Sequence, residues 1–324
     1  MQRVLVSSRS FGNVVTVGND LLKDAGLEVQ RVREEDRPLD VATLTSYVSR
    51  ECPTALITGA ESVPEPVLTA SGDLRMVMKH GVGVDNIDLV AATSRGILVA
   101  NAPSTNSDAV ADLAVGLMLA LLRRICEANA STHAGSWERY VGHDLGKSVV
   151  GVVGTGQIGA AVARRVHAFG ARLLGYDIVR DERLESACGM CYVSLDRLLS
   201  EADIVTLHAP LLPATLRMIG TSELELMKPS AFLINCARGE IVDEVALCAA
   251  LRSGKLAGAA FDVFATEPPQ DSPLLELDGV IATPHIAAYT YEAMEAMDRL
   301  CAQTVIDVLR HGALPPNVLN PEAT

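Results

Sequence analysis

Short β-rich apolar runs alternate with helical segments along the whole chain, and this rhythm constrains the fold more than any other feature. Many runs, such as Ala55–Gly59 and Ser148–Gly154, are continuously apolar, which indicates strands buried on both faces of a parallel sheet covered by helices. The sequence therefore predicts an α/β architecture with right-handed crossovers. The expected strands are Arg3–Ser8, Glu28–Val32, Ala55–Gly59, Arg75–His80, Leu98–Ala102, Ser148–Gly154, Arg172–Asp177, Ile204–Ala209, Ala231–Ala237, Ala257–Val263 and Val280–Pro284.

Two long helices interrupt this rhythm, one expected over Ser107–Ala128 and one over Tyr291–Arg310. The chain has 324 residues, enough for two domains at roughly 150 residues each. If the chain leaves one domain through the first helix and returns through the second, the middle section is an inserted domain. We therefore expect two doubly wound parallel-sheet domains. The outer domain is discontinuous, residues 1–100 and 286–324, and binds substrate; residues 101–285 are inserted in it.

The composition excludes several classes of protein. The 27 Lys and Arg against 40 Asp and Glu give a net charge of −13, and no clustered basic block is present to neutralise a nucleic-acid backbone. The most apolar segment, Val110–Leu122, is shorter than the ~18 residues of a membrane span. The N-terminus also lacks the apolar stretch and cleavage site of a signal peptide. We expect a protein that binds neither nucleic acid nor membrane.

The cysteines indicate the compartment. Their number, seven, is odd, and they are scattered along the chain, which suits a reducing cytoplasm. Cys188 and Cys191 form a CxxC that could be half of a metal site or a redox pair. No second CxxC or His pair completes four ligands, so a surface turn is favoured and no metal is expected.

A glycine motif lies in the middle section, where the apolar run Val149–Val153 leads into Gly154-Thr-Gly156-Gln-Ile-Gly159 and then an apolar helix. The first glycine permits a tight turn, the second lets the backbone approach a pyrophosphate, and the third lets helix pack on strand. The next strand ends in Asp177, where a dinucleotide fold places an acid on the adenine ribose. This carboxylate favours NAD because it repels the 2′-phosphate of NADP. The sequence predicts a Rossmann NAD-binding domain; the alternative is a glycine turn with an incidental Asp. The candidates in this part are Gly154, Gly156, Gln157, Ile158, Gly159 and Asp177.

Three further motifs follow predicted strands of the same domain and supply Arg238, then Glu267, then His285. Ligands of open parallel sheets lie beyond the carboxyl ends of the strands, so we expect these side chains to converge on the cofactor crevice. An arginine can clamp a substrate carboxylate, a histidine can exchange a hydroxyl proton, and a carboxylate can hold the imidazole and raise its pKa. Each residue alone could equally be a surface, turn or structural residue.

With these motifs the chain resembles the D-isomer-specific 2-hydroxyacid dehydrogenase family, most closely its phosphoglycerate dehydrogenase-like branch. The resemblance covers essentially the whole chain and includes Gly81–Asp88, Asn101–Asn106, Leu207–Pro213 and Asn235–Asp243. It implies a flavodoxin-like substrate domain around the Rossmann domain. We expect the short form, without a regulatory domain after Thr324.

The resemblance also implies roles for single residues. Arg238 would bind the carboxylate and carbonyl oxygen of a 2-keto acid, and His285, paired with Glu267, would be the general acid and base. Val82 and Gly83 would complete the carboxylate cradle through their backbone. On the cofactor side, the resemblance implies that Asp262 contacts the nicotinamide carboxamide and that His208, Pro210 and Thr215 line the adenosine. Ala237 is a further candidate for cofactor binding.

The substrate is constrained less tightly. Where phosphoglycerate dehydrogenases often carry an arginine after the third strand, this chain has Ile57–Glu61, which offers no guanidinium to a phosphate. Lys79 is the cation nearest by sequence and could meet a distal anion. We expect 3-phosphoglycerate or a related small anionic 2-hydroxy or 2-keto acid. Hydroxypyruvate, sulfopyruvate and a phosphonate analogue are alternatives. Phosphite oxidation is less favoured, and formate is disfavoured because Glu267 is not an amide.

Two expectations concern association and an alternative function. The apolar helix Ser107–Ala128 and the loop through Trp137 and Tyr140 predict a twofold homodimer interface, as the family implies; packing between the two domains of one chain is the alternative. A dehydrogenase-like fold could also serve as a non-catalytic NAD-sensing module. Intact Arg238, Glu267 and His285 argue against that, since a sensor needs no proton shuttle.

Overall fold

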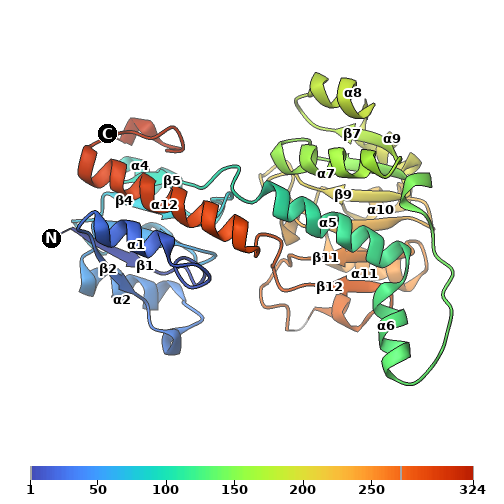
Figure 1. Ribbon diagram of the computed structural model, residues 1–324, viewed down its shortest axis with the longest axis horizontal. Coiled ribbons are helices and arrows are strands. Elements are labelled where there is room, and N and C mark those ends of the chain that lie inside the picture. Colours follow the sequence, from blue (N-terminus) through green and yellow to red (C-terminus); the bar gives the residue numbers. More distant parts are fainter. Residues whose placement is uncertain (1, 271, 324) are drawn as a thin grey trace. The chain divides into compact units, whose positions relative to one another are not determined.

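The computed structural model describes residues 2–270 and 272–323. Contacts between residues divide the chain into two compact units, with unit 1 formed by residues 1–106 and 289–324 and unit 2 by Ser107–Ala288. Each unit is a sheet with helices on both sides (Figure 1). Every strand pairing in both sheets is parallel. The prediction of two parallel α/β domains is confirmed.

Unit 1 contains a five-stranded sheet in the order β2-β1-β3-β4-β5. Its central strands β3 and β4 are buried along their whole length, and apart from Thr58 and Lys79 at their ends both are apolar, as strands covered on both faces are expected to be. Helix α12 begins after Thr290, whose side chain caps it, and ends at Gly312 in the left-handed conformation. The elements are β1 (Arg3–Val6), α1 (Val17–Asp24), β2 (Glu28–Arg31), α2 (Val41–Glu51), β3 (Ala55–Thr58), α3 (Glu65–Leu68), β4 (Met76–Lys79), α4 (Leu89–Ser94), β5 (Leu98–Ala100) and α12 (Tyr291–His311).

Unit 2 contains a seven-stranded sheet in the order β12-β11-β10-β9-β6-β7-β8. The order reverses between β6 and β9, the kind of switch point where doubly wound sheets bind their ligands. The elements are α5 (Ser107–Leu122), α6 (Ile125–His133), β6 (Val149–Val153), α7 (Gln157–Ala168), β7 (Arg172–Tyr176), α8 (Glu182–Cys188), β8 (Cys191–Tyr192), α9 (Leu195–Glu201), β9 (Ile204–Leu207), α10 (Thr221–Leu226), β10 (Phe232–Asn235), α11 (Glu244–Arg252), β11 (Gly258–Phe261) and β12 (Val280–Ala282).

Two apolar cores cover the faces of the seven-stranded sheet. One core is formed by α5, α7 and α8 against the sheet, and the other by α9, α10 and α11. Helix α5 contributes nine buried residues because nearly all of its length is apolar. Burial of this apolar surface is the main stabilisation of the unit, at about 25 cal/mol per Å².

The first long helix differs from its prediction. A single helix over Ser107–Ala128 was expected, but α5 ends at Leu122 and α6 begins at Ile125. Arg124 adopts a left-handed backbone, with φ of 51°. The backbone N–H of His143 donates to the carbonyl oxygen of Leu122 at 3.0 Å, so the returning loop occupies an acceptor at the helix end and separates α5 from α6.

The CxxC lies in a connection between elements. Cys188 ends α8 and is buried, Gly189 is left-handed, and Cys191 opens the short strand β8 and is exposed. Among the described residues, no group of three or more His, Cys, Asp or Glu side chains is placed to hold a metal ion. In the same part of the chain, no helix combines the length and the apolar character that a bilayer crossing requires.

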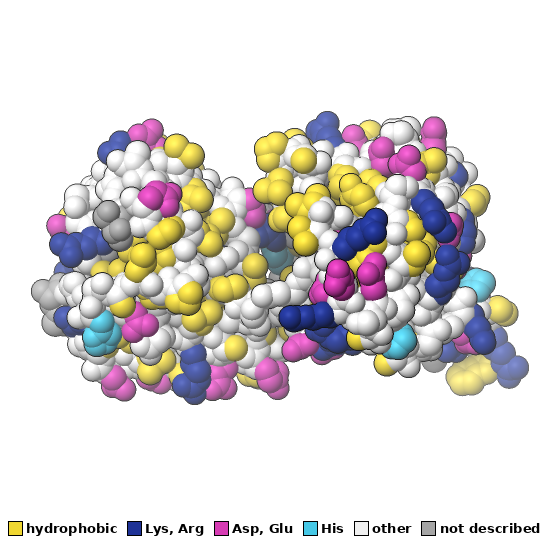
Figure 2. Space-filling model, turned by 90° about the horizontal axis from the view of Figure 1, so that it is seen from above, with side chains coloured by type: hydrophobic (Ala, Val, Ile, Leu, Met, Phe, Trp, Pro, Cys, Tyr) yellow, Lys and Arg dark blue, Asp and Glu magenta, His cyan; other side chains and the backbone are white. Residues whose placement is uncertain are grey.

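Charged side chains of both signs are interspersed on the face of the molecule seen in Figure 2. This face therefore carries no continuous basic surface of the kind that neutralises a polyanion.

Candidate functional site

The glycine turn after β6 has the geometry that a dinucleotide requires. Gly154 has a φ of 86°, and a Cβ atom there would lie 2.6 Å from the backbone nitrogen of Ala209. A Cβ on Gly159 would lie 1.9 Å from the carbonyl oxygen of Gly154, whereas one on Gly156 would meet nothing within 4 Å. The first and third glycines are thus required by packing. The second leaves open space in front of the N-terminus of α7, and the N-terminus of a helix favours a phosphate.

Asp177, just after β7, is held in place by that turn. Its Oδ2 accepts hydrogen bonds from the backbone N–H of Thr155 at 2.6 Å and from the Thr155 hydroxyl at 3.2 Å, and its Oδ1 accepts from Val179 N–H at 3.1 Å. The Tyr192 hydroxyl donates to Thr155 Oγ1 at 2.9 Å. The carboxylate oxygens retain lone pairs for ribose hydroxyls.

A cavity of about 530 Å³ opens beside Asp177 within unit 2. Its size and its carboxylate fit the adenosine end of a dinucleotide. The lining residues are Thr155, Gly156, Asp177, Val179, Arg180, Asp181, Glu182 and Arg183.

The remaining cofactor candidates lie on nearby turns of unit 2. His208 follows β9; its Nε2 is 2.9 Å from Thr206 Oγ1, and burial lowers its pKa to about 4. The Thr215 hydroxyl donates to the carbonyl oxygen of Pro210 at 2.6 Å and so closes that loop. The Ala237 N–H donates to the side-chain oxygen of Asn235 at 3.0 Å.

Two other candidates lie in the first turn of α7. Gln157 opens this helix, and Ile158 packs against the core. Both follow directly on Gly156, so they border the open space of the glycine turn.

Arg238 is positioned by the turn after β10. The Asn235 side-chain amide donates to the carbonyl oxygen of Arg238 at 2.8 Å, while Arg238 Nη1 donates to the carbonyl oxygen of Ala237 at 2.8 Å. A Cβ on Gly239 would lie 2.0 Å from the backbone carbon of Phe264. Glycine there lets the arginine turn approach the loop after β11. Burial raises the pKa of the neighbouring Cys236 thiol, which stays protonated.

Glu267 and His285 form a hydrogen-bonded pair. His285 Nδ1 donates to Glu267 Oε2 at 2.8 Å, and Glu267 Oε1 accepts from the N–H of Phe264 at 3.1 Å. Burial acts to raise the pKa of Glu267, but the hydrogen bond and charge of His285, with Phe264 and the charge of Arg238, hold it below its usual value. The carboxylate is therefore ionised and fixes a proton on Nδ1, which leaves Nε2 to exchange a proton.

The backbone around His285 is anchored by Asp262. His285 has a φ of 53°, a strained conformation for a non-glycine residue. Asp262 is fully buried, and its oxygens accept from the Thr283 hydroxyl at 2.6 Å and from the N–H groups of Ile286 and Ala287 at 2.9 and 2.8 Å. Burial raises the pKa of this carboxyl, and the three hydrogen bonds oppose the rise. Asp262 thus holds the turn in addition to its predicted contact with the cofactor.

The predicted substrate residues of unit 1 follow β4. Gly81 has a φ of 153°, and Asn101 Nδ2 donates to the carbonyl oxygen of Val82 at 2.6 Å, which fixes the turn containing Gly83. Lys79 is 7% exposed, and its Nζ donates to the carbonyl oxygen of Gly59 at 2.5 Å and to Asn86 Oδ1 at 2.8 Å. Its ammonium group therefore braces the loop after β3.

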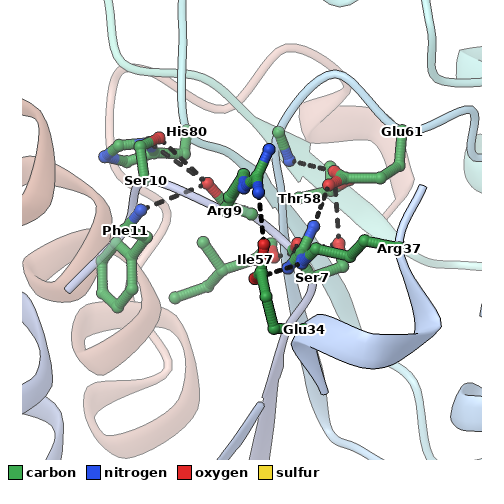
Figure 3. A network of polar contacts seen from close by, with 12 residues as sticks. Ser7, Arg9, Ser10, Phe11, Glu34, Arg37, Ile57, Thr58, Glu61 and His80 are labelled. Atoms are coloured by element: carbon green, nitrogen blue, oxygen red, sulfur yellow. Dashed lines mark hydrogen bonds and ion pairs between the residues drawn. The ribbon is translucent and has the colours of Figure 1, made fainter. Parts of the chain in front are cut away.

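That loop carries Glu61 within the network of Figure 3. Glu61 Oε2 accepts from Gly59 N–H at 2.7 Å and from the Thr58 hydroxyl at 3.1 Å, and Oε1 pairs with Arg37 Nη1 at 3.2 Å. Arg37 Nη2 also donates to the carbonyl oxygen of Ser7 at 2.5 Å. The side chains of Arg37 and Glu61 are each 11% exposed. Arg37 is therefore engaged within the fold.

The structure brings together Arg238, Glu267 and His285, which follow the adjacent strands β10, β11 and β12. Sequence reasoning missed Thr155, which donates to Asp177, and Tyr192, which donates to Thr155. Thr155 could have been found, since it lies inside the glycine motif. Tyr192 carries no such signal, because its strand has only two residues.

Comparisons with known proteins agree with this geometry. Residues 115–287 match the family model of the D-isomer specific 2-hydroxyacid dehydrogenase, NAD binding domain. A D-3-phosphoglycerate dehydrogenase of Methanocaldococcus jannaschii is 44% identical over 82% of this chain and 51% of its own length. A glyoxylate reductase of Korarchaeum cryptofilum is 41% identical over 84% of each chain. The chain spans about half the length of the phosphoglycerate dehydrogenases it matches.

Solved structures give the same result. The D-lactate dehydrogenase of Aquifex aeolicus, complexed with NAD and lactic acid, superposes with a TM-score of 0.87 at 29% identity, over 98% of this chain and 99% of that one.

Proposed function

The chain belongs to the D-isomer-specific 2-hydroxyacid dehydrogenase family, and on that premise we propose that it interconverts a small D-2-hydroxy acid and its 2-keto acid with NAD. The observation that carries the proposal is the hydrogen bond of 2.8 Å between His285 Nδ1 and Glu267 Oε2, next to Arg238. A cation, a proton carrier and an orienting carboxylate are the groups that this reaction needs from the protein.

NAD is the cofactor of the chain, as the family of its central domain indicates. When bound, NAD supplies the hydride-transfer chemistry. The open space at Gly156 and the N–H groups opening α7 suit its pyrophosphate, and Asp177 suits its adenine ribose.

Arg238 and His285 have different roles toward the substrate. The Arg238 guanidinium binds the carboxylate and orients the carbonyl group. His285 Nε2 gives its proton to the substrate oxygen in the reducing direction and takes it back in the oxidising direction. Glu267 keeps the proton on Nδ1 in both directions and stabilises the imidazolium. Val82 and Gly83 are proposed to bind the same carboxylate through their backbone.

Two candidate substrates differ in the group that lies at the end away from the carboxylate. We expect 3-phosphoglycerate or a related small anionic hydroxy acid, and Lys79 is the proposed partner of a distal anion. One observation favours a second candidate, a short 2-oxo acid without a distal anion, such as hydroxypyruvate or glyoxylate. The loop after β3 presents Glu61, and the nearby guanidinium of Arg37 is paired to it. A relative named D-3-phosphoglycerate dehydrogenase and one named glyoxylate reductase match this chain at similar identity.

The test is kcat/KM for a panel of substrates. With NAD the panel is 3-phosphoglycerate, D-glycerate, D-lactate, sulfolactate and phosphonolactate, and with NADH it is hydroxypyruvate and glyoxylate. The highest value with 3-phosphoglycerate would support the first candidate, and the highest value with hydroxypyruvate or glyoxylate the second. NAD binding without turnover of any substrate would instead support a non-catalytic NAD-sensing module.

We also propose a homodimer and a cytoplasmic location. Exposed apolar side chains on α6 and the following loop support the dimer: Ile125 is 51% exposed, Trp137 81% and Val141 93%. Light scattering on a size-exclusion column would measure the mass, and Trp137→Ser with Val141→Ser should shift it to one chain. An unchanged dimer mass in this variant would contradict the assignment of the interface.

A further inference from the structure

Three residues that line the cavity beside Asp177 are connected through the hydroxyl group of Tyr192. The backbone N–H of Asp181 donates to this oxygen at 3.1 Å, and the hydroxyl donates in turn to Thr155 Oγ1 at 2.9 Å. The Thr155 hydroxyl then donates to Asp177 Oδ2 at 3.2 Å. Thr155, Asp177 and Asp181 all line the cavity. One phenol group therefore ties the glycine turn to the loop that follows β7.

This chain of hydrogen bonds has one direction, which its two ends determine. A backbone N–H can only donate and a carboxylate can only accept, so both hydroxyl groups pass a hydrogen bond on in the same sense. Hydrogen bonds linked in this way polarise and strengthen one another. Asp181 is also the N-cap of α8, so the phenol anchors the start of that helix as well. Without the phenol oxygen, the Asp181 N–H loses this acceptor and the Thr155 oxygen loses this donor.

The neighbouring strand makes room for the aromatic ring of Tyr192. In the pairing of β8 with β7, Tyr192 lies opposite Gly175. A Cβ atom on Gly175 would lie 3.1 Å from Tyr192 Cε1 and 2.6 Å from Met190 Sδ. Glycine inside a strand weakens it and often marks a place where another group approaches closely. The ring also packs against the core formed by α5, α7 and α8. Packing therefore sets the position of the ring, and the ring carries the hydroxyl to the cavity wall.

We propose that Tyr192 is a positioning residue for the adenosine end of NAD, which holds the glycine turn and the loop after β7 in place before the cofactor binds. This inference deepens the proposed function and rests on it, since it takes the cavity as the adenosine site. A wall that is already ordered costs less free energy to order on binding, so the tie contributes to affinity. The reacting carbon of NAD lies in the nicotinamide, at the other end of the dinucleotide. Tyr192 should therefore affect cofactor affinity and leave the rate at saturating cofactor unchanged.

Tyr192→Phe tests this, because it removes one oxygen atom and keeps the ring. Isothermal titration calorimetry without substrate should show NAD⁺ binding weakened about three- to tenfold, the usual effect of losing a neutral hydrogen bond. AMP, which carries only the adenosine end, should weaken by the same factor in competition with NAD⁺, whereas nicotinamide mononucleotide should be unaffected. In steady-state kinetics KM for NADH should rise by a similar factor, with kcat within about twofold of wild type.

A second variant removes the same hydrogen bond from its other side. Thr155→Val keeps the shape of the side chain and loses the hydroxyl, so it should also weaken NAD⁺ and AMP. Because both changes remove the Tyr192–Thr155 hydrogen bond, the double variant should weaken NAD⁺ by less than the product of the two single effects.

Tyr47→Phe is the matched control in unit 1. The Tyr47 hydroxyl accepts from the backbone N–H of Arg33 at 3.3 Å and donates to the Asp36 carboxylate, so it has the same pattern of contacts as Tyr192. Tyr47 is 5% exposed and lies on α2, away from the cavity of unit 2. Its loss should lower thermal stability and leave NAD⁺ and AMP affinity unchanged.

Three results would overturn the inference. The first is NAD⁺ or AMP affinity that stays at the wild-type value in both Tyr192→Phe and Thr155→Val. The second is an equal loss of affinity in Tyr47→Phe, which would mean that general stability is responsible. The third is a double variant whose effect equals the product of the single effects. Failure of the wild-type chain to bind NAD⁺ would overturn the proposed function as well, whereas any of these three results with NAD⁺ bound by the wild type overturns the inference alone.

Discussion

Replacing Asp298 by alanine should destabilise unit 1 by about 3 kcal/mol. Asp298 lies on α12, and its Oδ1 accepts from His80 Nε2 at 2.8 Å while its Oδ2 accepts from Gly12 N–H at 2.9 Å. Both side chains of the pair are 1% exposed. His80 Nδ1 is in turn 3.0 Å from the Ser10 hydroxyl, and Figure 3 shows these two residues. Alanine leaves a buried imidazole and a partly buried N–H without acceptors, and breaking such pairs costs about 3–5 kcal/mol.

The lower end of that range applies because water can enter the space left by the carboxylate. For a unit of this size about 3 kcal/mol lowers the unfolding midpoint by roughly 10 °C. Differential scanning calorimetry with saturating NAD should resolve the effect, since a ligand of unit 2 raises the stability of that unit only. The transition of unit 1 should then move down alone.

Glu295→Ala is the matched control on the same helix. Its ion pair with Arg299 spans 2.7 Å, but the side chains are 50% and 56% exposed, so its loss should cost at most about 0.5 kcal/mol. A shift of less than about 2 °C for Asp298→Ala, or equal shifts for both variants, would refute the reasoning.

Three further predictions concern unit 2. His285→Ala should lower kcat by about 10²–10⁴-fold, the usual share of a general acid, with NADH affinity near wild type by fluorescence titration; unchanged turnover would exclude the assignment. Arg238→Ala should raise KM for 2-keto acids far more than for a neutral aldehyde, and equal losses would argue against a carboxylate clamp. Burial lowers the pKa of His208 to about 4 in the folded state. Below a pH of about 6.5, the ordinary pKa of a histidine, the unfolded state therefore binds more protons than the folded state. Stability should fall as pH drops from 7 to 5, by about 1–2 kcal/mol in urea titrations, and His208→Gln should remove this part of the loss.

The parts of the fold that follow from local pattern could be predicted from the sequence. The strand β6, the glycine turn and α7 follow from residues adjacent in the chain, and so does Asp177 at the end of the next strand. The break between α5 and α6 could not be predicted. It depends on the N–H of His143, which reaches the Leu122 carbonyl from a distant loop.

The site divides in the same way. The residue types and their positions after successive strands predicted Arg238, Glu267 and His285, because parallel strands end at one edge of a sheet. The anchoring of the turn around His285 by Asp262 could not be predicted from the sequence, which indicated this residue only as a contact of the cofactor. The pairing of Arg37 with Glu61 also joins distant segments and carries no local signal.

Asp262 and Asp298 show a common use of a buried carboxylate in the two units. Both are fully buried, and each accepts hydrogen bonds beside a predicted binding element. Asp262 accepts from two backbone N–H groups at the turn that contains His285, whereas Asp298 accepts from the N–H of Gly12 and from the side chain of His80, which precedes Gly81. An apolar residue could replace such an acid at little cost in stability if its partners were also replaced. It could not direct several donors to fixed positions. The buried acids therefore serve the placement of the site more than the stability of the fold.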